Sequence, residues 1–403
     1  MEVLYPRCCG LDIHKKEVTA CVIIRGKRDT RTFATMTNDL LKLKAWLLEL
    51  EVTHVGIEST GVFWKPVYNL LEDKLTMVLT NPHQIKALPG RKTDVKDAEW
   101  LADLLRHGLV KGSFVPARNQ REQRELTRYR RNLIEERSRV VERMQQVLEG
   151  ANIKLSSVAT DITGASGRSM LEAMINGVSE PDTLAEMAQG RMRKKKAALE
   201  EALNGLIGEH QKMMLASQLR HVDFLDAEIA RLDAQIASRL EPDAELMERL
   251  DEIPGVNRRI AEEYMAEVGK SVEHFATSRH LASWIGLCPG NYESAGKRKG
   301  GRTRHGNRWL CSALVQAARR ASKSRGSYLS AQYHRLAARR GDKRAIVAVA
   351  HSICVIIYNM ISRGTKYSEL GNLYFDQRDT ERVLRRTVHR IEALGYKVSV
   401  EAA

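Results

Sequence analysis

Four carboxylates in the first hundred residues have the types and positions needed to hold metal ions. Asp12 lies within a run of apolar residues, and Glu58 ends another. Asp94 and Asp97 are three residues apart, where a helix is expected to begin. Carboxylates beside buried strands are costly unless something neutralises them. Hard oxygen ligands suit Mg²⁺ or Mn²⁺, so we expect a divalent metal site.

Alternating strand and helix signals between residues 7 and 115 define the elements that must position these acids. Strands are expected at 8–13, 18–25, 54–58 and 76–80, and helices at 38–50, 62–71 and 94–107. The polar turn at 14–17 predicts a hairpin between the first two strands. Together these signals predict an α/β domain with a mixed sheet, in which Asp94 and Asp97 share one face of a helix.

The two helical acids also fit a purely structural role. Asp94 has the residue type of a helix N-cap, and Asp97 would lie in the first turn, where the helix dipole favours an acid. For this pair alone, the structural and the metal-binding interpretations are balanced. Because Asp12 and Glu58 complete the set, metal binding is favoured for the four acids together.

The positive charge of the chain is concentrated in one segment. Among 403 residues there are 65 Lys and Arg against 50 Asp and Glu, which gives a net charge of +15. Residues 1–115 hold 17 cations and 14 acids, whereas residues 290–344 hold 15 cations and only 2 acids. A charge added only for solubility would be spread more evenly. The distribution therefore predicts a polyanionic partner.

Several classes of protein are disfavoured by the composition. The six cysteines form no C-x-x-C pair, so neither a zinc site nor a disulfide framework is expected. The N-terminus has no apolar core of a signal peptide. The most apolar run, 345–361, is shorter than the roughly 20 residues that span a membrane. We therefore expect a cytoplasmic protein with reduced thiols and a buried helix at this run.

Beyond residue 116 the sequence predicts helices. Residues 117–245 contain two long segments with apolar residues at heptad spacing, separated by a glycine-broken stretch at 160–205. An antiparallel helical arm with a coiled-coil seam is expected, paired either within one chain or between chains. Residues 246–345 form a third part with a Pro-Gly turn, and residues 346–403 form a helical tail. The α/β domain at 1–116 completes the four-part organisation.

Ser294 is the second residue with chemical potential. It lies in a loop rich in glycine and lysine, where glycines let the backbone approach a phosphate closely and cations stabilise a phosphoryl transition state. By composition alone, an ordinary loop serine is the commoner explanation. The residues expected to contact nucleic acid are Lys15, Arg91, Lys92, Lys297, Arg298, Lys299, Arg302, Arg304, Asn307 and Arg308.

Short motifs occur along nearly the whole chain. The N-terminal ones are Gly10-Leu-Asp-Ile-His-Lys15, Ile57-Glu-Ser-Thr-Gly61, Asn81-Pro-His-Gln-Ile-Lys86 and Gly90-Arg-Lys-Thr-Asp94. The C-terminal ones are Ile253-Pro-Gly255, Trp284-Ile-Gly-Leu-Cys-Pro289, Glu293-Ser-Ala-Gly-Lys297 and His305-Gly-Asn307. In this order the motifs resemble those of the DEDD transposases of bacterial insertion sequences, a family that includes the Piv-type DNA invertases.

The resemblance implies a RuvC-like, RNase H-like N-terminal domain whose metal ligands are Asp12, Glu58, Asp94 and Asp97. A helical arm and a mostly α-helical transposase domain would follow. The resemblance also implies that Ser294 attacks double-stranded DNA and forms a phosphoserine link, with the metal activating a hydroxyl that is otherwise a weak nucleophile. Such a link conserves the phosphodiester energy, so rejoining needs no ATP.

The resemblance further implies partners for this chain. A structured bridge RNA would pair with donor and target DNA, and the chain would form a tetramer of paired dimers in the bacterial cytoplasm, associated with the nucleoid when active. The acidic site of one subunit would join the serine of another. Sequence choice would then lie mainly in base pairing, with the protein binding phosphates in a salt-dependent way.

One departure and two other interpretations stay open. The serine motif reads Ser294-Ala-Gly, where many relatives have Ser-Gly; Ser283 and Ser312 are alternative nucleophiles, although both lie in apolar helical segments. The chain would instead be a RuvC-like endonuclease if water attacked and Ser294 only positioned DNA. It would be a non-catalytic nucleic-acid-binding protein if the acids were vestigial, but the presence of all four weighs against that.

Overall fold

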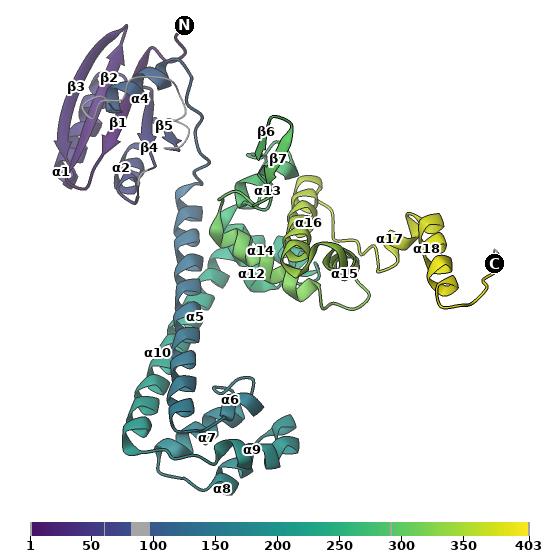
Figure 1. The fold of residues 1–403 in the computed structure, drawn as a ribbon. Coiled ribbons are helices and arrows are strands. Elements are labelled where there is room, and N and C mark those ends of the chain that lie inside the picture. The colour runs from purple at the N-terminus through teal and green to yellow at the C-terminus, as the bar shows by residue number, and fades with distance from the viewer. Residues whose placement is uncertain (1, 60, 82–96, 291, 402–403) are drawn as a thin grey trace. The chain divides into compact units, whose positions relative to one another are not determined.

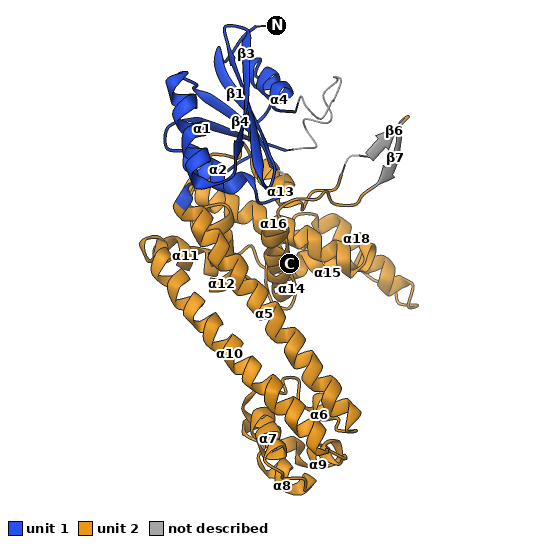
Figure 2. Ribbon diagram, turned by 90° about the vertical axis from the view of Figure 1, so that its left-hand side faces the viewer, with its two compact units in different colours: residues 1–118 blue, residues 119–403 orange. Residues whose placement is uncertain are grey.

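The computed structural model describes residues 2–59, 61–81, 97–290 and 292–401, without the side chains of 292–294 and 297–300. Contacts divide the chain into two compact units, Met1–Arg118 and Asn119–Ala403 (Figure 2). Each unit has its own core of buried apolar residues. The division of the chain at 116, 245 and 345 stays a prediction.

A five-stranded mixed sheet forms the centre of the first unit (Figure 1). Its strands are β1 (Arg7–Ile13), β2 (Glu17–Ile24), β3 (Lys27–Ala34), β4 (His54–Glu58) and β5 (Thr76–Thr80), in the order β3-β2-β1-β4-β5. The first three strands are antiparallel, whereas β1, β4 and β5 run parallel. The mixed sheet expected from the sequence is confirmed.

Strand β3 is the element of this sheet that the sequence does not predict. Its eight residues, KRDTRTFA, carry charges on both faces, and all but one of them are exposed. It lies at the edge of the sheet and pairs with β2 along its full length. Charged side chains are typical of edge strands, because they discourage pairing with other chains. Backbone pairing rather than apolar alternation defines this strand.

Three described helices cover the two faces of the sheet. They are α1 (Thr37–Glu49), α2 (Trp64–Leu71) and α4 (Asp97–Arg106). On one face, Cys9 and Leu11 of β1 join a core with buried residues of α1 and α2. On the other face, Cys8 packs against Ala102 of α4. The alternation of side chains along β1 therefore separates two cores, and among the described helices α4 covers the second.

The second unit is almost entirely helical. Its helices are α5 (Arg118–Gly150), α6 (Leu155–Val158), α7 (Ala165–Ile175), α8 (Pro181–Glu186), η2 (Gly190–Lys195), α9 (Lys196–Leu203), α10 (Glu209–Leu240), η3 (Glu241–Asp243), α11 (Ala244–Asp251), α12 (Arg258–Glu267), α13 (Ser278–Ile285), α14 (Arg308–Ala321), α15 (Tyr328–Arg340), α16 (Asp342–Arg363), α17 (Tyr374–Gln377) and α18 (Thr380–Glu392). Strands β6 (Tyr292–Ser294) and β7 (Lys297–Gly300) form a hairpin between α13 and α14.

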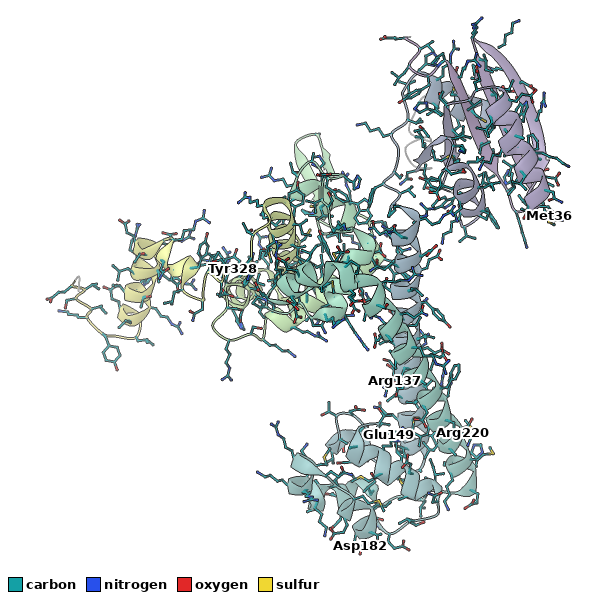
Figure 3. The ribbon with its side chains drawn as sticks, turned by 180° about the vertical axis from the view of Figure 1, so that it is seen from behind. Met36, Arg137, Glu149, Asp182, Arg220 and Tyr328 are labelled. Atoms are coloured by element: carbon teal, nitrogen blue, oxygen red, sulfur yellow. The ribbon has the colours of Figure 1, made fainter. Side chains whose placement is uncertain are left out.

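The helices α5 and α10 form an antiparallel arm, and Figure 3 shows Arg137 and Arg220 on it. Near one end Glu122 of α5 pairs with Arg239 of α10 at 3.1 Å, and further along Arg137 pairs with Asp226 at 2.5 Å. Residue numbers rise on one helix as they fall on the other, so the two helices run in opposite directions within one chain. Apolar residues of both helices share a core with α6–α9 at the far end of the arm.

Helix α16 is the centre of the C-terminal part of the second unit. Eight of its side chains are buried, and it packs against α13, α14 and α15. Among the described residues it is the one helix whose length and composition would allow it to cross a membrane. The packing of three helices around it fits the buried helix expected at 345–361.

Candidate active site

The pairing of β1 with β4 brings two of the predicted acids together. Leu11 pairs with Ile57 in the parallel register of these strands, so Asp12 and Glu58 are the next residues on each. Neighbouring strands lie about 4.8 Å apart, and residues in register point to the same face. Both acids are partly buried, with 24% of the Asp12 side chain exposed. The two carboxylates are 46 positions apart in the sequence but adjacent in the sheet.

Helix α4 approaches the same face, because Gly10 leaves room for its backbone. A Cβ atom at Gly10 would collide with the backbone of Ala98 and Ala102, so only glycine fits. Ala102 also accepts a hydrogen bond from the Cys8 thiol, nearer the start of β1. The helix therefore runs antiparallel to β1. Its N-terminus, where Asp97 lies, points toward the end of β1 that carries Asp12.

The predicted acidic site is thus assembled in part by the described residues. Asp12 and Glu58 are neighbours at the carboxyl ends of β1 and β4, and α4 begins at Asp97 on the face of the sheet that they share. Asp94 lies outside the described residues, as do Arg91 and Lys92. Among the residues that are described, no group of three His, Cys, Asp or Glu side chains is close enough to hold one ion. The oxygen donors present are nonetheless those that Mg²⁺ or Mn²⁺ prefers.

A tight turn follows β1 and brings His14 to Asp12. The Nε2 atom of His14 lies 3.3 Å from the Asp12 carboxylate. The His14 backbone N–H donates to the carbonyl of Glu17, and the Thr35 hydroxyl donates to the carbonyl of Lys15, so the turn is held from both sides. Lys15 itself is exposed. The turn can therefore present Lys15 to a phosphate while its backbone stays fixed.

The predicted nucleophile, Ser294, lies at the end of β6, directly before a two-residue turn. Ser294 pairs with Lys297, and the two residues between them have positive φ angles, 53° at Ala295 and 71° at Gly296. Positive φ at both central positions is what a type I′ hairpin turn requires. The turn residues are exposed. The alanine that distinguishes this motif therefore occupies the tip of the hairpin, next to the serine backbone.

The two alternative serines lie in helices, as expected. Ser312 is on α14, and its hydroxyl accepts a hydrogen bond of 2.6 Å from Arg131. Ser283 is an exposed residue of α13, and its backbone carbonyl accepts from the N–H of Gly286. Ser312 thus has a structural partner, and neither serine is part of the glycine-rich loop.

The other residues expected to bind nucleic acid differ in their surroundings. Arg302 and Arg304 are exposed in the segment that leads from β7 to α14. Arg308 lies over the ring of Trp309, 4.6 Å from its centroid. Asn307 caps α14 and also donates to Glu267, so its amide has internal partners. Lys297, Arg298 and Lys299 belong to β7.

A buried network of arginines and glutamates is a feature that the sequence motifs do not predict. Arg128 of α5 donates two hydrogen bonds to Glu267 of α12, at 2.7 and 2.9 Å. Arg131 donates to Glu263 at 2.7 Å, and burial raises the pKa of that carboxyl. The sequence does contain a signal for it: Arg121, Arg124, Arg128 and Arg131 recur at three- and four-residue spacing, which places them along one helix face.

Two family models match the chain. Residues 9–153 match the family DEDD_Tnp_IS110, described as a transposase. Residues 247–334 match the family described as the IS116/IS110/IS902 transposases. Together the two matches span more than half of the sequence and include Asp12, Glu58 and Ser294.

Curated relatives are transposases as well. A putative transposase of Sinorhizobium fredii, y4pF/y4sB, is 27% identical over 283 residues, which are 69% of this chain and 64% of the relative. A probable family 20 transposase of Pseudomonas aeruginosa is 25% identical over 320 residues, 78% of this chain and 85% of the relative. The transposase for insertion sequence element IS1111A of Coxiella burnetii is 34% identical over 124 residues, 30% of this chain and 34% of the relative.

A mixed sheet with carboxylates at the ends of its parallel strands, followed by a helical unit, agrees with these matches to transposase families, and the chain spans 64% of the length of the first of these relatives. The sheet and its helices are consistent with an RNase H-like DEDD domain. The chain belongs to the IS110 family of DEDD transposases.

Proposed function

We propose that this chain cuts and rejoins double-stranded DNA for an insertion sequence, with Ser294 as the nucleophile and a phosphoserine link as the intermediate. The observation that carries the proposal is the register of β1 and β4, which makes Asp12 and Glu58 neighbours at the edge that α4 approaches. A solitary acid there would be an ordinary surface residue. Two acids in register, on the face where a helix with a third acid begins, support a site for phosphodiester chemistry.

The hairpin supports the role of Ser294. A type I′ turn is short and rigid, so a residue directly before it is displayed at a defined position at the end of two paired strands. In the proposed step, the serine oxygen forms a bond to phosphorus while the bond from phosphorus to a deoxyribose oxygen breaks. The serine loses its proton, and the departing oxygen gains one. The reverse step, with a hydroxyl of another strand, restores the serine and joins the DNA.

Asp12, Glu58, Asp94 and Asp97 would hold Mg²⁺ or Mn²⁺, since all four offer carboxylate oxygens. When bound, such ions stabilise negative charge on the attacking and leaving oxygens of an in-line displacement. The protein's own part is to place the carboxylates, through strand register for Asp12 and Glu58 and through helix α4 for Asp97.

We further propose that the site is composite, with the acids of one subunit acting with Ser294 of another in a dimer or tetramer. The arm fits an antiparallel coiled coil that pairs within the chain: Arg130 of α5 bonds Asp233 of α10 at 2.8 Å, in the same antiparallel order as the outer pairs. If the arm satisfies its own seam, contacts between subunits must come from other surfaces.

A cluster of cations in the second unit fits the phosphate backbone of DNA. We call it the basic corner; it consists of Arg319, Arg320, Arg339, Arg340, Lys343 and Arg344, all exposed. These residues lie at the ends of α14 and α15 and at the start of α16. The Tyr333 hydroxyl donates to Asp342 at 2.8 Å and lies within electrostatic range of Arg319, so the end of α14 is close to the start of α16. In the part of the chain that is described, no acid forms an ion pair with these six side chains.

A guide RNA is proposed as the source of sequence specificity, acting with the protein in the bacterial cytoplasm. The protein has few aromatic residues, 5% of the sequence, so it offers little surface for stacking on bases. Binding dominated by phosphate contacts suits a protein that delegates base reading to RNA. Sequencing the RNA that copurifies with the chain tests this; a random population of cellular fragments would contradict it.

The central experiment uses a DNA substrate that traps covalent intermediates. Incubation with Mg²⁺ should yield a protein–DNA adduct with the native chain and none with Ser294→Ala. The matched control is Ser283→Ala, which should form the adduct normally because that serine lies on α13. If nicked DNA with free ends accumulates and Ser294→Ala still cuts, the chain is a water-using endonuclease and the serine mechanism is wrong.

A further inference from the structure

Glu267, the last residue of α12, is buried among three side chains that bind its carboxylate. Its side chain is 1% exposed. Arg128 donates a hydrogen bond to each carboxylate oxygen, and the Asn307 amide donates to one of them at 2.6 Å. Arg124 forms an ion pair with the carboxylate at 3.1 Å and donates to the backbone carbonyls of Ala266 and Glu267. Two of the three side chains therefore come from α5 of the arm, and one comes from the segment that follows the serine hairpin.

Asn307 connects this anion to the local backbone. Its Oδ1 atom accepts hydrogen bonds of 3.1 Å from the N–H groups of Trp309 and Leu310, which caps α14. Its own N–H donates to the carbonyl of Trp284 on α13, at 3.0 Å. Both ends of the Asn307 side-chain amide and its backbone N–H are thus engaged. The residue joins α13, α14 and Glu267 at one point.

The same point is the root of the serine hairpin. Gly306 packs its backbone directly against Ile285 and Gly286 at the end of α13. The N–H of Gly290, on the segment entering the hairpin, donates to the carbonyl of Arg302, on the segment leaving it, at 2.8 Å. Both segments are therefore tied together near Asn307, and a shift of Asn307 would tilt the hairpin as a body.

Stability alone is a poor explanation for this arrangement. Burying a carboxylate with cations costs desolvation that their attraction barely offsets, and apolar replacements are often at least as stable. Burial also lowers the pKa of Arg124 to about 10. The network instead fixes the orientation of Glu267, because the two-pronged contact with Arg128 and the hydrogen bond from the Asn307 amide allow only one position of the carboxylate.

We propose that Glu267 is a positioning residue, which fixes the root of the serine hairpin to α5 through Asn307 and so determines where Ser294 is presented. By this route, hydrogen bonds connect α5 of the arm to the root of the hairpin through Glu267 and Asn307. The inference rests on the proposed role of Ser294, and its experiment separates the two.

The test exchanges the two side-chain types across the hydrogen bond. Glu267→Gln removes the negative charge and places an amide opposite the Asn307 amide. Asn307→Asp places a second carboxylate opposite Glu267, while aspartate remains a good helix N-cap. The double variant restores an amide opposite a carboxylate and keeps one negative charge beside Arg124 and Arg128. The control is Arg168→Gln, which breaks a two-pronged pair with Asp223 elsewhere on the arm.

We expect each single variant to slow adduct formation by about 10- to 100-fold, the scale that small misplacement of reacting groups costs. DNA affinity should change little, and Arg168→Gln should react at the native rate. The thermal midpoint of each single variant should fall, because a buried charge loses its partner, and should recover in the double variant, so rates are compared below the lowest midpoint. The double variant should recover most of the rate. Native rates in folded single variants, or a double variant as slow as the two effects combined, would overturn the proposal.

Hydrogen exchange tests the positioning role of Glu267 without depending on the serine mechanism. The N–H groups of Gly290 and Asn307 close the root, so both single variants should lose protection there and the double variant should regain it. If the native chain forms no adduct yet exchange follows this pattern, the role of Ser294 is wrong and the positioning role stands. If adducts form but protection of these two amides is unchanged in the single variants, the positioning role is wrong.

Discussion

Asp12 and Glu58 show how the chemistry depends on single residues of a sheet. Each occupies the last part of its strand, where the core ends and solvent begins, so an ionised carboxylate there is only partly desolvated. His14 contacts Asp12 from the following turn. The register that aligns the two acids is the same one that buries Cys9 and Leu11, so the site follows from the core.

Asp12→Asn should therefore remove activity without unfolding the sheet. The amide keeps the shape but loses the charge that holds a metal, and we expect strand cleavage to fall by more than the roughly 10- to 100-fold that outer partners of a metal site contribute. Cleavage of a labelled DNA end measures it, with Glu17→Gln, an exposed residue of the same hairpin, as the control. Equal activity of Asp12→Asn and Glu17→Gln would show that Asp12 holds no essential metal.

Ala295 bears backbone strain at the hairpin tip. Its φ of 53° lies in the left-handed region, which costs a non-glycine residue roughly 1–2 kcal/mol. Ala295→Gly should relieve that strain and strengthen exchange protection across β6 and β7. Gly296→Ala, at φ 71°, should have the opposite effect. Weaker protection in Ala295→Gly would mean that the lower flexibility of alanine stabilises the hairpin more than the strained φ angle destabilises it.

At the scale of elements, the arm illustrates what heptad spacing does and does not determine. Val222, Leu225 and Ile229 are buried, as the apolar spacing predicts. The same spacing serves equally for pairing within or between chains. Ion pairs between α5 and α10 are made within one chain, whereas the spacing itself gives no preference.

Leu225→Ala should destabilise the second unit, whereas Phe224→Ala should not. Leu225 is 2% exposed in the core of the arm, and a leucine truncated in such a place costs about 2–5 kcal/mol. Phe224 is the preceding residue but is 59% exposed, so its loss should stay within about 0.5 kcal/mol. Urea unfolding followed by helical signal compares the two. Similar midpoints for both variants would place the seam on another face of α10.

Other elements mark the limit of prediction from local patterns. Strands β1, β2, β4 and β5 follow from apolar runs, but β3 has a polar sequence and exists because its backbone pairs with β2. Likewise, the arginines of α5 look like an ordinary charged helix surface. They are buried only because α12 brings Glu262, Glu263 and Glu267 against them. Neither feature can be seen without the partner element.

At the scale of the whole molecule, the uneven distribution of charge along the sequence concentrates exposed cations in one part of the structure. The 15 cations between residues 290 and 344 include the hairpin and the basic corner, whereas the arginines of α5 are mostly neutralised by acids. The excess of charge available to DNA therefore lies in the second unit, beyond the arm.

Arg339→Gln combined with Arg340→Gln should weaken DNA binding uniformly across sequences. Removing one cation that binds a phosphate should lower the slope of log affinity against log salt by about 0.9, so the pair should lower it by up to about 2. Arg382→Gln with Arg385→Gln is the control, because those arginines of α18 already face Asp379 and Glu381. A titration of DNA affinity against salt measures both. An unchanged slope for the first pair would remove the basic corner from the DNA-binding surface.

The sequence by itself determined the family, the four acids and the candidate serine, because these reside in short motifs whose residue types are readable one after another. The tertiary structure alone decided that Asp12 and Glu58 are neighbours, that ion pairs join α5 to α10, and that Glu267 contacts Asn307 at the root of the serine hairpin. These are contacts between residues 40 to 117 positions apart. Strand register, helix packing and buried charge pairing set them, and each depends on two elements meeting, which no single stretch of sequence encodes.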